Sequence, residues 1–300
     1  MKERKSESLL INGIRSRPVN RSSGSLYVVA TPIGNLEDIT LRALRILKSV
    51  ATIAAENVVH SKVLCRHFKI KTRIISFNQH NQKAKAPVLI GMLKSGDDVA
   101  VVTDAGTPGI SDPGVYFINL ALEGGFRVIP IPGPSALITA LSVSGMQIDK
   151  FIFLGFLSNK PGRRKNQLRE LSSETCTMVF YEAPHRLSAM LKDIKEVMGD
   201  RQILMGREMT KVFEDVKRGP VSAIIESLPG DKIKGEITLV VAGKGEKMLK
   251  PFSSDILNDI DKMIAEQRMS IKDIADLISK REELSFRQVY KECIARKEFK

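Results

Sequence analysis

The sequence predicts an α/β protein of two domains, followed by a small helical segment. The chain has 300 residues, of which 43% are hydrophobic and 27% are charged, so it can bury more than one core. Its first part alternates short unbroken apolar runs with amphipathic segments, which is typical of a parallel sheet covered by helices on both faces. Its middle part has more closely spaced apolar runs, and its last part shows helical spacing.

The composition divides the chain into four parts. Residues 1–24 carry six basic and two acidic residues and end in polar residues, which predicts a basic flexible arm outside the fold. We expect an N-terminal α/β domain over residues 25–133 and a C-terminal mixed α/β domain over residues 134–245. We expect a helical segment over residues 252–300.

Strands and helices should alternate in the N-terminal domain. The apolar runs predict strands at residues 26–31, 51–56, 73–77, 98–104 and 127–132. The amphipathic runs predict helices that include residues 41–50, 63–68, 88–93 and 116–125. This order predicts a parallel sheet.

The second domain should hold a mixed sheet. Closely spaced apolar runs predict strands, with hairpins and fewer helices between them, at residues 151–156, 176–182, 201–208, 211–219 and 235–243. In the last segment, Ser270 and Ser285 each open a helix, with Asp273 and Gln288 three residues later. The short corner between these helices fits a helix-turn-helix and equally a small helical cap.

The charge of the chain favours a polyanionic partner. Lys and Arg number 47 against 34 Asp and Glu, which gives a net charge of +13 and points toward nucleic acid. The three cysteines, Cys65, Cys176 and Cys293, are widely separated and show no zinc-site spacing, so we expect no metal and a reducing compartment. No apolar run is long enough for a signal sequence or a membrane span, so we expect a cytoplasmic protein without a membrane partner.

A loop after one predicted strand has an unusual composition. Ligands of open α/β sheets bind at the carboxyl ends of strands, where the sequence "DAGTPGISDPG" places Asp104. A pyrophosphate prefers backbone N–H donors, yet Asp104 and Asp112 would repel it, and Pro108 and Pro113 lack N–H groups. Carboxylates suit instead a cofactor with a positive centre, an ammonium group and ribose hydroxyls, and S-adenosyl-L-methionine has all three.

Other polar motifs also follow predicted strands. Pro32 enters a tight loop that is either a ligand-facing turn or a plain one, and Ser135 either caps a helix or faces the cofactor. Titratable groups crowd two strand ends that we expect to be neighbours, namely Tyr181, Glu182, His185 and Arg186 after one strand and Arg207, Glu208, Thr210 and Lys211 after the other. A Gly/Pro loop holds basic residues that are either solvated or bound to phosphates, namely Lys160, Arg163, Arg164 and Lys165.

Five motifs in this order resemble the tetrapyrrole methylase superfamily, and within it the methyltransferases that act on a ribose 2′-hydroxyl of small-subunit ribosomal RNA. They are "ATPIGNLEDIT", "DAGTPGISDPG", "PGPSA", "YEAPHR" and "GREMTKVFE", within residues 26–243. The resemblance implies a tetrapyrrole methylase-like fold of two α/β domains with S-adenosyl-L-methionine in the cleft between them, in a homodimer. It implies that the substrate is a cytidine in the decoding centre of 16S rRNA on the small ribosomal subunit.

The resemblance also implies site residues. Motif by motif, it assigns cofactor contacts to Pro32, Asp104, Ala105, Ile110, Ser135, Ala136, Glu182 and Thr238. One block departs from the subfamily, which usually reads "AEDTR" after its second strand. This chain keeps Glu56 and has Asn57 and Val59 in place of the Asp and the Arg.

Methyl transfer from a sulfonium needs alignment above all, and a weakly acidic ribose hydroxyl gains from a nearby base or cation. Our hypothesis is that four residues frame the acceptor as catalytic groups, namely Glu182, His185, Glu208 and Lys211. Six basic residues are expected to contact RNA phosphates, namely Lys160, Arg163, Arg164, Lys165, Arg186 and Arg207. Two alternatives are a methyltransferase acting on a tetrapyrrole or corrinoid precursor and a non-catalytic RNA-binding relative.

Overall fold

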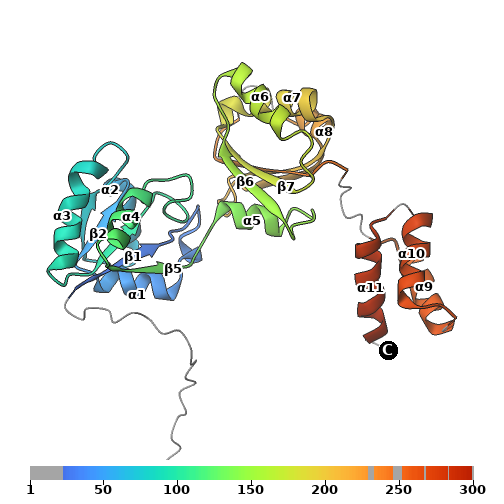
Figure 1. The fold of residues 1–300 in the computed structure, drawn as a ribbon, viewed down its shortest axis with the longest axis horizontal. Coiled ribbons are helices and arrows are strands. Elements are labelled where there is room, and N and C mark those ends of the chain that lie inside the picture. The colour runs from blue at the N-terminus through green and yellow to red at the C-terminus, as the bar shows by residue number, and fades with distance from the viewer. Residues whose placement is uncertain (1–22, 229–232, 246–251, 267, 283, 299–300) are drawn as a thin grey trace, which may run out of the picture. The chain divides into compact units, whose positions relative to one another are not determined.

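The computed structural model describes residues 23–228, 233–245, 252–266, 268–282 and 284–298 (Figure 1). The expected basic arm therefore lies almost wholly outside the described residues. Contacts divide the chain into two units: the first runs to Pro134 without Ile33–Asn35, and the second contains Ile33–Asn35 and continues from Ser135.

The first unit is the alternating α/β fold that the apolar runs predicted. Its five strands form one parallel sheet in the order β3-β2-β4-β1-β5. The elements are β1 (Ser25–Val29), η1 (Leu36–Asp38), α1 (Leu41–Ser49), β2 (Thr52–Ala55), α2 (Val58–His67), β3 (Arg73–Ser76), α3 (Gln82–Lys94), β4 (Val99–Val102), α4 (Val115–Glu123) and β5 (Arg127–Ile131). β2 and β4 are buried throughout, which explains their unbroken apolar sequences.

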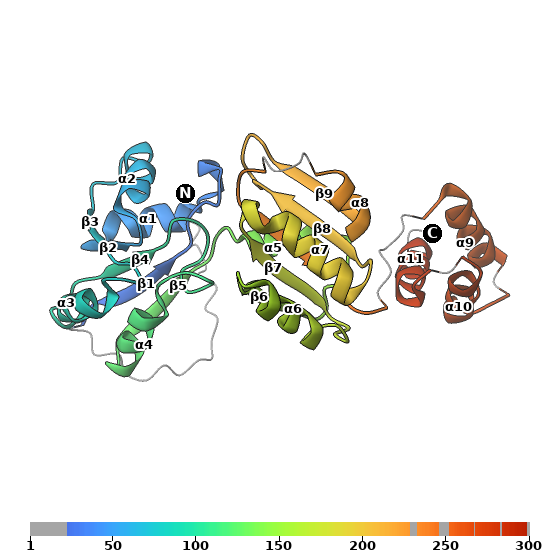
Figure 2. The ribbon, with the colours of Figure 1, turned by 90° about the horizontal axis from the view of Figure 1, so that it is seen from above.

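Helices cover this sheet on both faces. α1 and α2 pack on one face through residues such as Leu47 and Leu64, and α3 and α4 pack on the other through residues such as Leu89 and Phe117. Figure 2 shows the sheet between the two helix pairs. The loop that leaves β4 therefore leads to one face and the loops that leave its neighbours β1 and β2 lead to the other, which is the arrangement at which ligands of open α/β sheets bind.

The second unit contains the expected mixed sheet, in the order β6-β7-β10-β8-β9. β6 is parallel to β7, and the remaining neighbours are antiparallel. The elements are α5 (Ala136–Ser142), β6 (Phe151–Phe156), α6 (Pro161–Glu170), β7 (Thr177–Glu182), η2 (Pro184–Arg186), α7 (Leu187–Met198), β8 (Gln202–Arg207), β9 (Asp215–Pro220), α8 (Val221–Glu226) and β10 (Ile237–Val241). The prediction of several hairpins was too broad, because in the described residues only β8 and β9 follow one another without a helix between them.

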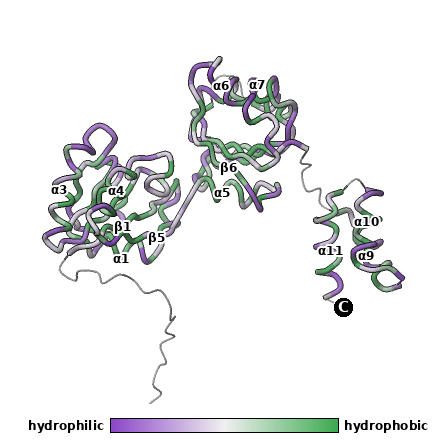
Figure 3. The backbone as a smooth tube through the Cα atoms, in the orientation of Figure 1, coloured by the Kyte–Doolittle hydropathy of each residue, from purple (hydrophilic) through white to green (hydrophobic). Residues whose placement is uncertain are grey.

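The two faces of the second sheet carry different cores. Met178, Met205 and Leu239 face α6, α7 and α8, whereas Val179 and Leu204 face α5. Figure 1 shows α5 on one side of the sheet and α6, α7 and α8 on the other. In Figure 3 the inner strands are hydrophobic and the outer loops hydrophilic.

The C-terminal helices have a core of their own. α9 (Ser254–Glu266), α10 (Ile271–Arg281) and α11 (Phe286–Glu298) bury apolar residues such as Ile260 and Ile278 against one another. The predicted cap of α10 is confirmed, since Ser270 Oγ accepts a hydrogen bond from the Asp273 N–H at 3.2 Å. None of the helices that the structure describes is long and apolar enough to cross a membrane.

Candidate functional site

Two loops at the carboxyl edge of the first sheet are joined by backbone hydrogen bonds. The Thr31 N–H donates to the Gly106 carbonyl at 2.9 Å, and the Gly106 N–H returns a bond to the Thr31 carbonyl at 3.0 Å. The Thr31 hydroxyl donates to the Thr103 carbonyl at 3.1 Å. Gly106 has a φ of +75°, a conformation that glycine adopts without strain. The loop after β4 is therefore held firmly against the loop after β1.

Acidic groups gather at this edge. The Asp104 N–H donates to Glu56 Oε2 at 3.3 Å, which joins the loops after β4 and β2. Burial raises the pKa of Glu56 and the Asp104 charge adds to this, against the lowering effect of the Asp104 N–H. His60 Nδ1 lies 3.2 Å from Asp104 Oδ2, and the Asp104 side chain is 36% exposed. An exposed carboxylate at this edge of the sheet fits a cationic ligand and opposes a phosphate.

The altered block after β2 has a structural role. Asn57 is the N-cap of α2, and its side-chain oxygen accepts a hydrogen bond from the Val59 N–H at 2.9 Å. Asparagine and aspartate are both good N-caps, so this helix start tolerates the change from the subfamily sequence. Val59, which stands where the subfamily has an Arg, is 69% exposed.

The remaining predicted cofactor residues of the first unit lie along the same loops. Pro32 is buried directly after β1, and Ala105 is half-buried beside the joined backbone of Gly106. Ile110 is 41% exposed on the loop between β4 and α4. An exposed apolar side chain beside carboxylates suits a ligand that has both a cationic and an apolar part.

Ser135 and Ala136 open α5 in the second unit. Ser135 Oγ accepts a hydrogen bond from the Ile138 N–H at 3.5 Å, which is the capping alternative that the sequence left open. Ala136 is half-buried and packs against the core beneath α5. Their proposed contact with a cofactor stays a prediction.

The polar strand ends of the second unit lie in one row. Glu182, Ile237, Arg207 and Asp215 are in register across β7, β10, β8 and β9. The expectation that the two titratable strand ends are neighbours was therefore wrong, because β10 lies between β7 and β8. Strand order depends on long-range pairing, which the local sequence does not show.

Glu182 and Thr238 face opposite sides of this sheet. Thr238 pairs with Tyr181, whose ring packs on the α5 side, and Glu182 is the next residue along β7. Successive side chains of a strand point to opposite faces, so the Glu182 carboxylate points to the side of α6 and α7. The side chains of Glu182 and Thr238 therefore point to different faces of the sheet. The resemblance implied contacts made largely through the backbone, and such contacts of both residues with the cofactor stay predictions.

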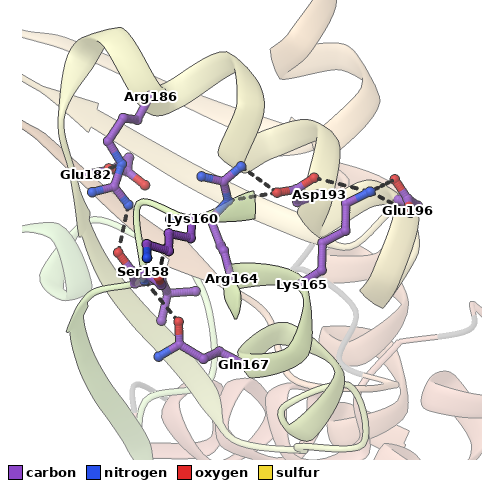
Figure 4. A network of polar contacts seen from close by, with 10 residues as sticks. Ser158, Lys160, Arg164, Lys165, Gln167, Glu182, Arg186, Asp193 and Glu196 are labelled. Carbon is purple, nitrogen blue, oxygen red and sulfur yellow. Dashed lines mark hydrogen bonds and ion pairs between the residues drawn. The ribbon is translucent and has the colours of Figure 1, made fainter. Parts of the chain in front are cut away.

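The Glu182 carboxylate is also enclosed by protein groups (Figure 4). Its side chain is fully buried, accepts a hydrogen bond from the Ala183 N–H at 2.8 Å and lies 3.0 Å from Arg186 Nε. Burial raises the pKa of Glu182, against the lowering effects of Ala183 N–H and the Arg186 charge. Because this carboxylate is shielded from the surface, Glu182 is corrected as one of the four groups expected to frame the acceptor.

Glu208 and Lys211 form a pair after β8. Lys211 Nζ and the Glu236 N–H both donate to Glu208 Oε1, at 2.8 and 3.0 Å. Burial alone would raise the pKa of Glu208, but these hydrogen bonds and the Lys211 charge bring it below its ordinary value. Burial alone would lower the pKa of Lys211, but its acidic partners raise it. Both groups are therefore ionised at neutral pH.

His185 and Arg207 occupy different environments. His185 is exposed in η2, whereas Arg207 is half-buried with Nη2 3.5 Å from Asp215 Oδ2. Arg207 keeps 27% of its side chain exposed, so it retains access to a phosphate. The Lys211 side chain is 30% exposed. His185, Glu208 and Lys211 remain candidates for the acceptor site.

The sequence predicted a loop for the basic residues at 160–165, but the structure places them at the start of α6. Pro161 takes the first helical turn, where its missing N–H costs nothing. The helix turns Arg164 into the protein, where Nε and Nη2 lie 2.7 and 2.6 Å from Asp193 Oδ2 of α7 (Figure 4). Only 4% of its side chain is exposed, so Arg164 is corrected as an RNA contact.

Two further predicted RNA contacts are occupied by protein groups. Lys165 Nζ donates to Glu196 at 2.7 Å, and Arg186 Nη2 donates to the Leu157 carbonyl at 2.7 Å with 18% of its side chain exposed. Arg186 is therefore corrected as a phosphate contact. Lys160 and Arg163 remain exposed and accessible.

Sequence reasoning missed Asp193 and Glu196 as partners of this network. They lie on α7 about thirty residues from their partners, so spacing gave no signal. The pairing of His60 with Asp104 was also missed. Among the described residues, no group of three or more His, Cys, Asp or Glu side chains is placed to hold a metal ion.

Two known proteins with similar sequences have the same name. The ribosomal RNA small subunit methyltransferase I of Pseudomonas aeruginosa is 42% identical over 252 residues, which cover 82% of this chain and 88% of that protein. The protein of the same name from Vibrio cholerae is 39% identical over 279 residues, covering 92% and 96%.

Solved structures share the fold at low sequence identity. A uroporphyrin-III C-methyltransferase from Thermus thermophilus, complexed with S-adenyl homocysteine, has a TM-score of 0.54 and 18% identity and covers 73% of this chain and 97% of its own. A cobalt precorrin-4 methyltransferase has a TM-score of 0.56 and 15% identity, covering 73% and 94%. The family described as tetrapyrrole (corrin/porphyrin) methylases matches residues 25–225. The chain therefore belongs to the tetrapyrrole (corrin/porphyrin) methylase family.

Proposed function

We propose that this chain is an S-adenosyl-L-methionine-dependent methyltransferase that methylates the ribose 2′-hydroxyl of a cytidine in the decoding centre of 16S rRNA on the small ribosomal subunit. The observation that carries the proposal is the 42% identity, over most of both chains, to a ribosomal RNA small subunit methyltransferase I. The homodimer that the sequence resemblance implies stays a prediction.

The residues at the carboxyl edge of the first sheet fit the proposed cofactor. Asp104 offers a carboxylate to a cationic group, and Ile110 offers an exposed apolar side chain on the same loop. Pro108 and Pro113 lack the N–H groups that a phosphate would need. When bound, S-adenosyl-L-methionine supplies a methyl group on a positively charged sulfur. The contacts expected from Ser135, Ala136 and Thr238 stay predictions.

Three residues of the second unit remain candidates to act on the acceptor hydroxyl. The hydrogen bonds from Lys211 Nζ and the Glu236 N–H both reach Oε1 of Glu208, so Oε2 is placed to accept a hydrogen bond from a hydroxyl group. Lys211 stays a cation and would stabilise negative charge that develops on an oxygen beside it. Exposed His185 is the third candidate, as a proton acceptor.

Methyl transfer in solution tests the proposal. The purified full-length protein is incubated with radiolabelled S-adenosyl-L-methionine and one of three acceptors: isolated small ribosomal subunits, large subunits, or uroporphyrinogen. We expect label in the RNA of the small subunits only. Label in uroporphyrinogen alone would assign the chain to precursor methylation. Cofactor binding without transfer to any acceptor would support a non-catalytic relative.

A further inference from the structure

One stretch of the first unit contains basic residues and no acidic ones. Residues 57–96 hold no Asp or Glu, although the chain's 34 acidic residues in 300 would place about four or five in a stretch of this length. The stretch contains three of the four histidines. Its basic residues are Lys62, Arg66, Lys69, Lys71, Arg73, Lys83, Lys85 and Lys94.

The fold places this stretch around one border of the sheet. β3 is an edge strand that pairs with β2 alone. α2, before it, packs on one face of the sheet through Leu64, and α3, after it, packs on the other through Leu89. The chain thus wraps the free side of β3 from one face to the other. We call the eight basic residues named above the basic edge. Seven of them precede the last turn of α3, and Lys94 ends that helix beside the start of β1, where the Leu93 carbonyl accepts a hydrogen bond from the Gly24 N–H.

The side chains of the basic edge are available to a partner. All eight residues are exposed. In the part of the chain that the structure describes, none of the eight takes part in an ion pair, whereas Arg164, Lys165 and Lys211 of the second unit are paired with carboxylates. Unpaired cations attract a polyanion without first giving up an internal partner.

The rest of the first unit and the C-terminal helical segment do not match this concentration of charge. The basic edge holds eight of the twelve Lys and Arg in residues 25–134 and none of the eight acidic residues there. Residues 254–300, with the helix-turn-helix-like segment, hold ten basic and ten acidic residues and are neutral overall. By charge, the sheet border is a stronger polyanion site than the helical segment.

The neighbouring polar residues favour RNA over other polyanions. Residues 78–82, from the loop after β3 into the start of α3, read "NQHNQ", with Gln79 and His80 exposed. Amide and imidazole groups bond to phosphates, ribose hydroxyls and base edges. The 13 residues of α3 span about 20 Å, the length of about six phosphates along one strand of a duplex.

We propose that the basic edge binds the phosphate backbone of the RNA substrate. This inference rests on the proposed function for the identity of the RNA, and it places the main electrostatic contact on the first unit. The basic edge takes the place of Arg164 and Arg186 as the principal phosphate contact, because those two side chains are already bonded to other groups of the protein. The exposed Lys160 and Arg163 remain secondary candidates.

A matched pair of triple variants tests the proposal. One replaces Lys62, Arg66 and Lys85 on α2 and α3 with Gln. The control replaces Lys262, Lys272 and Lys291 with Gln, one each on α9, α10 and α11. Each variant removes three exposed helical cations, and Gln has a helix propensity close to that of Lys and Arg. Both proteins should therefore fold.

Binding to isolated small ribosomal subunits is measured at several salt concentrations. Each lost phosphate contact reduces the slope of log affinity against log salt by about 0.7 to 0.9, so the basic-edge variant should lose about 2 to 3 in slope. We expect weaker binding by tenfold or more at low salt and a higher KM for methyl transfer, with kcat and cofactor affinity kept. The control should keep the wild-type slope.

The inference and the proposed function fail in different ways. A basic-edge variant with the wild-type slope, or a control that loses as much, overturns the inference even if wild-type protein methylates the RNA. A specific loss of binding supports the inference even if wild-type protein transfers no methyl group. Basic-edge-dependent binding to phosphatidylserine vesicles, with RNA binding unchanged, would overturn the assignment to RNA.

Discussion

The buried ion pair between α6 and α7 gives a sharp test of the structure. Arg164 and Asp193 have 4% and 10% of their side chains exposed, and two guanidinium nitrogens lie within 2.7 Å of one carboxylate oxygen. Removing one partner of such a pair costs about 3 to 5 kcal/mol, because it leaves a buried charge uncompensated. Replacing both partners by apolar residues of similar size is close to neutral.

We therefore expect Asp193→Leu to destabilise this region by about 3 kcal/mol, the lower end of that range, because the Glu182 carboxylate lies near enough to Arg164 to compensate part of its charge. Arg164→Met should be similarly harmful, since Lys165 Nζ, at 3.7 Å, only partly replaces the lost partner of Asp193. The double variant should recover most of the loss.

Hydrogen exchange measured on peptides of α6 and α7 reports this local stability directly. A loss of about 3 kcal/mol corresponds to about 150-fold faster exchange in the single variants. Lys165→Met is the control, because its partner Glu196 is 60% exposed and the exchange rates should change little. Single variants that exchange at the wild-type rate, or a double variant in which the two losses add, would refute the reasoning.

Three further predictions concern carboxylates. Burial raises the pKa of Glu182 in the folded state, so its contribution to stability is complete below the ordinary Glu pKa and falls as pH rises through the folded value. The urea midpoint of wild type relative to Glu182→Gln should fall as the pH rises above the ordinary Glu pKa of about 4.3, and a rising difference would contradict this. Asp104→Asn should weaken cofactor binding in calorimetry about 10- to 100-fold, as expected for a lost charged hydrogen bond. The control is Asp97→Asn, beyond the opposite end of β4, which should leave cofactor binding unchanged. Equal effects of the two substitutions would exclude a special role for Asp104. Glu208→Gln should lower kcat for methyl transfer about 100-fold or more with cofactor affinity kept, and an unchanged kcat would exclude it from the acceptor site.

Local patterns predicted the first unit well because its strands are buried on both sides. The unbroken apolar sequences of β2 and β4 follow directly from that burial, and the parallel sheet follows from the helices between them. The loop after β4 was also located correctly at the carboxyl edge, since its Asp104 follows a clear strand.

Long-range contacts explain what sequence reasoning missed. Pro161 and Gly162 read as a loop, yet a proline in the first turn of a helix is favourable, so α6 begins there. The burial of Arg164 depends on Asp193, 29 residues away. That the side chains of Glu182 and Thr238 point to opposite faces of the sheet follows only from the register of β7 and β10, which the local sequence does not show.

Nucleoside analysis of the methylated product tests the central claim most directly. Small ribosomal subunits from a strain that lacks the modification are incubated with the full-length protein and S-adenosyl-L-methionine, and their 16S rRNA is digested and examined by mass spectrometry. The account predicts one new 2′-O-methylcytidine, within the decoding centre, that depends on the protein. A methyl group on a base, on another nucleotide or on no RNA at all would contradict it.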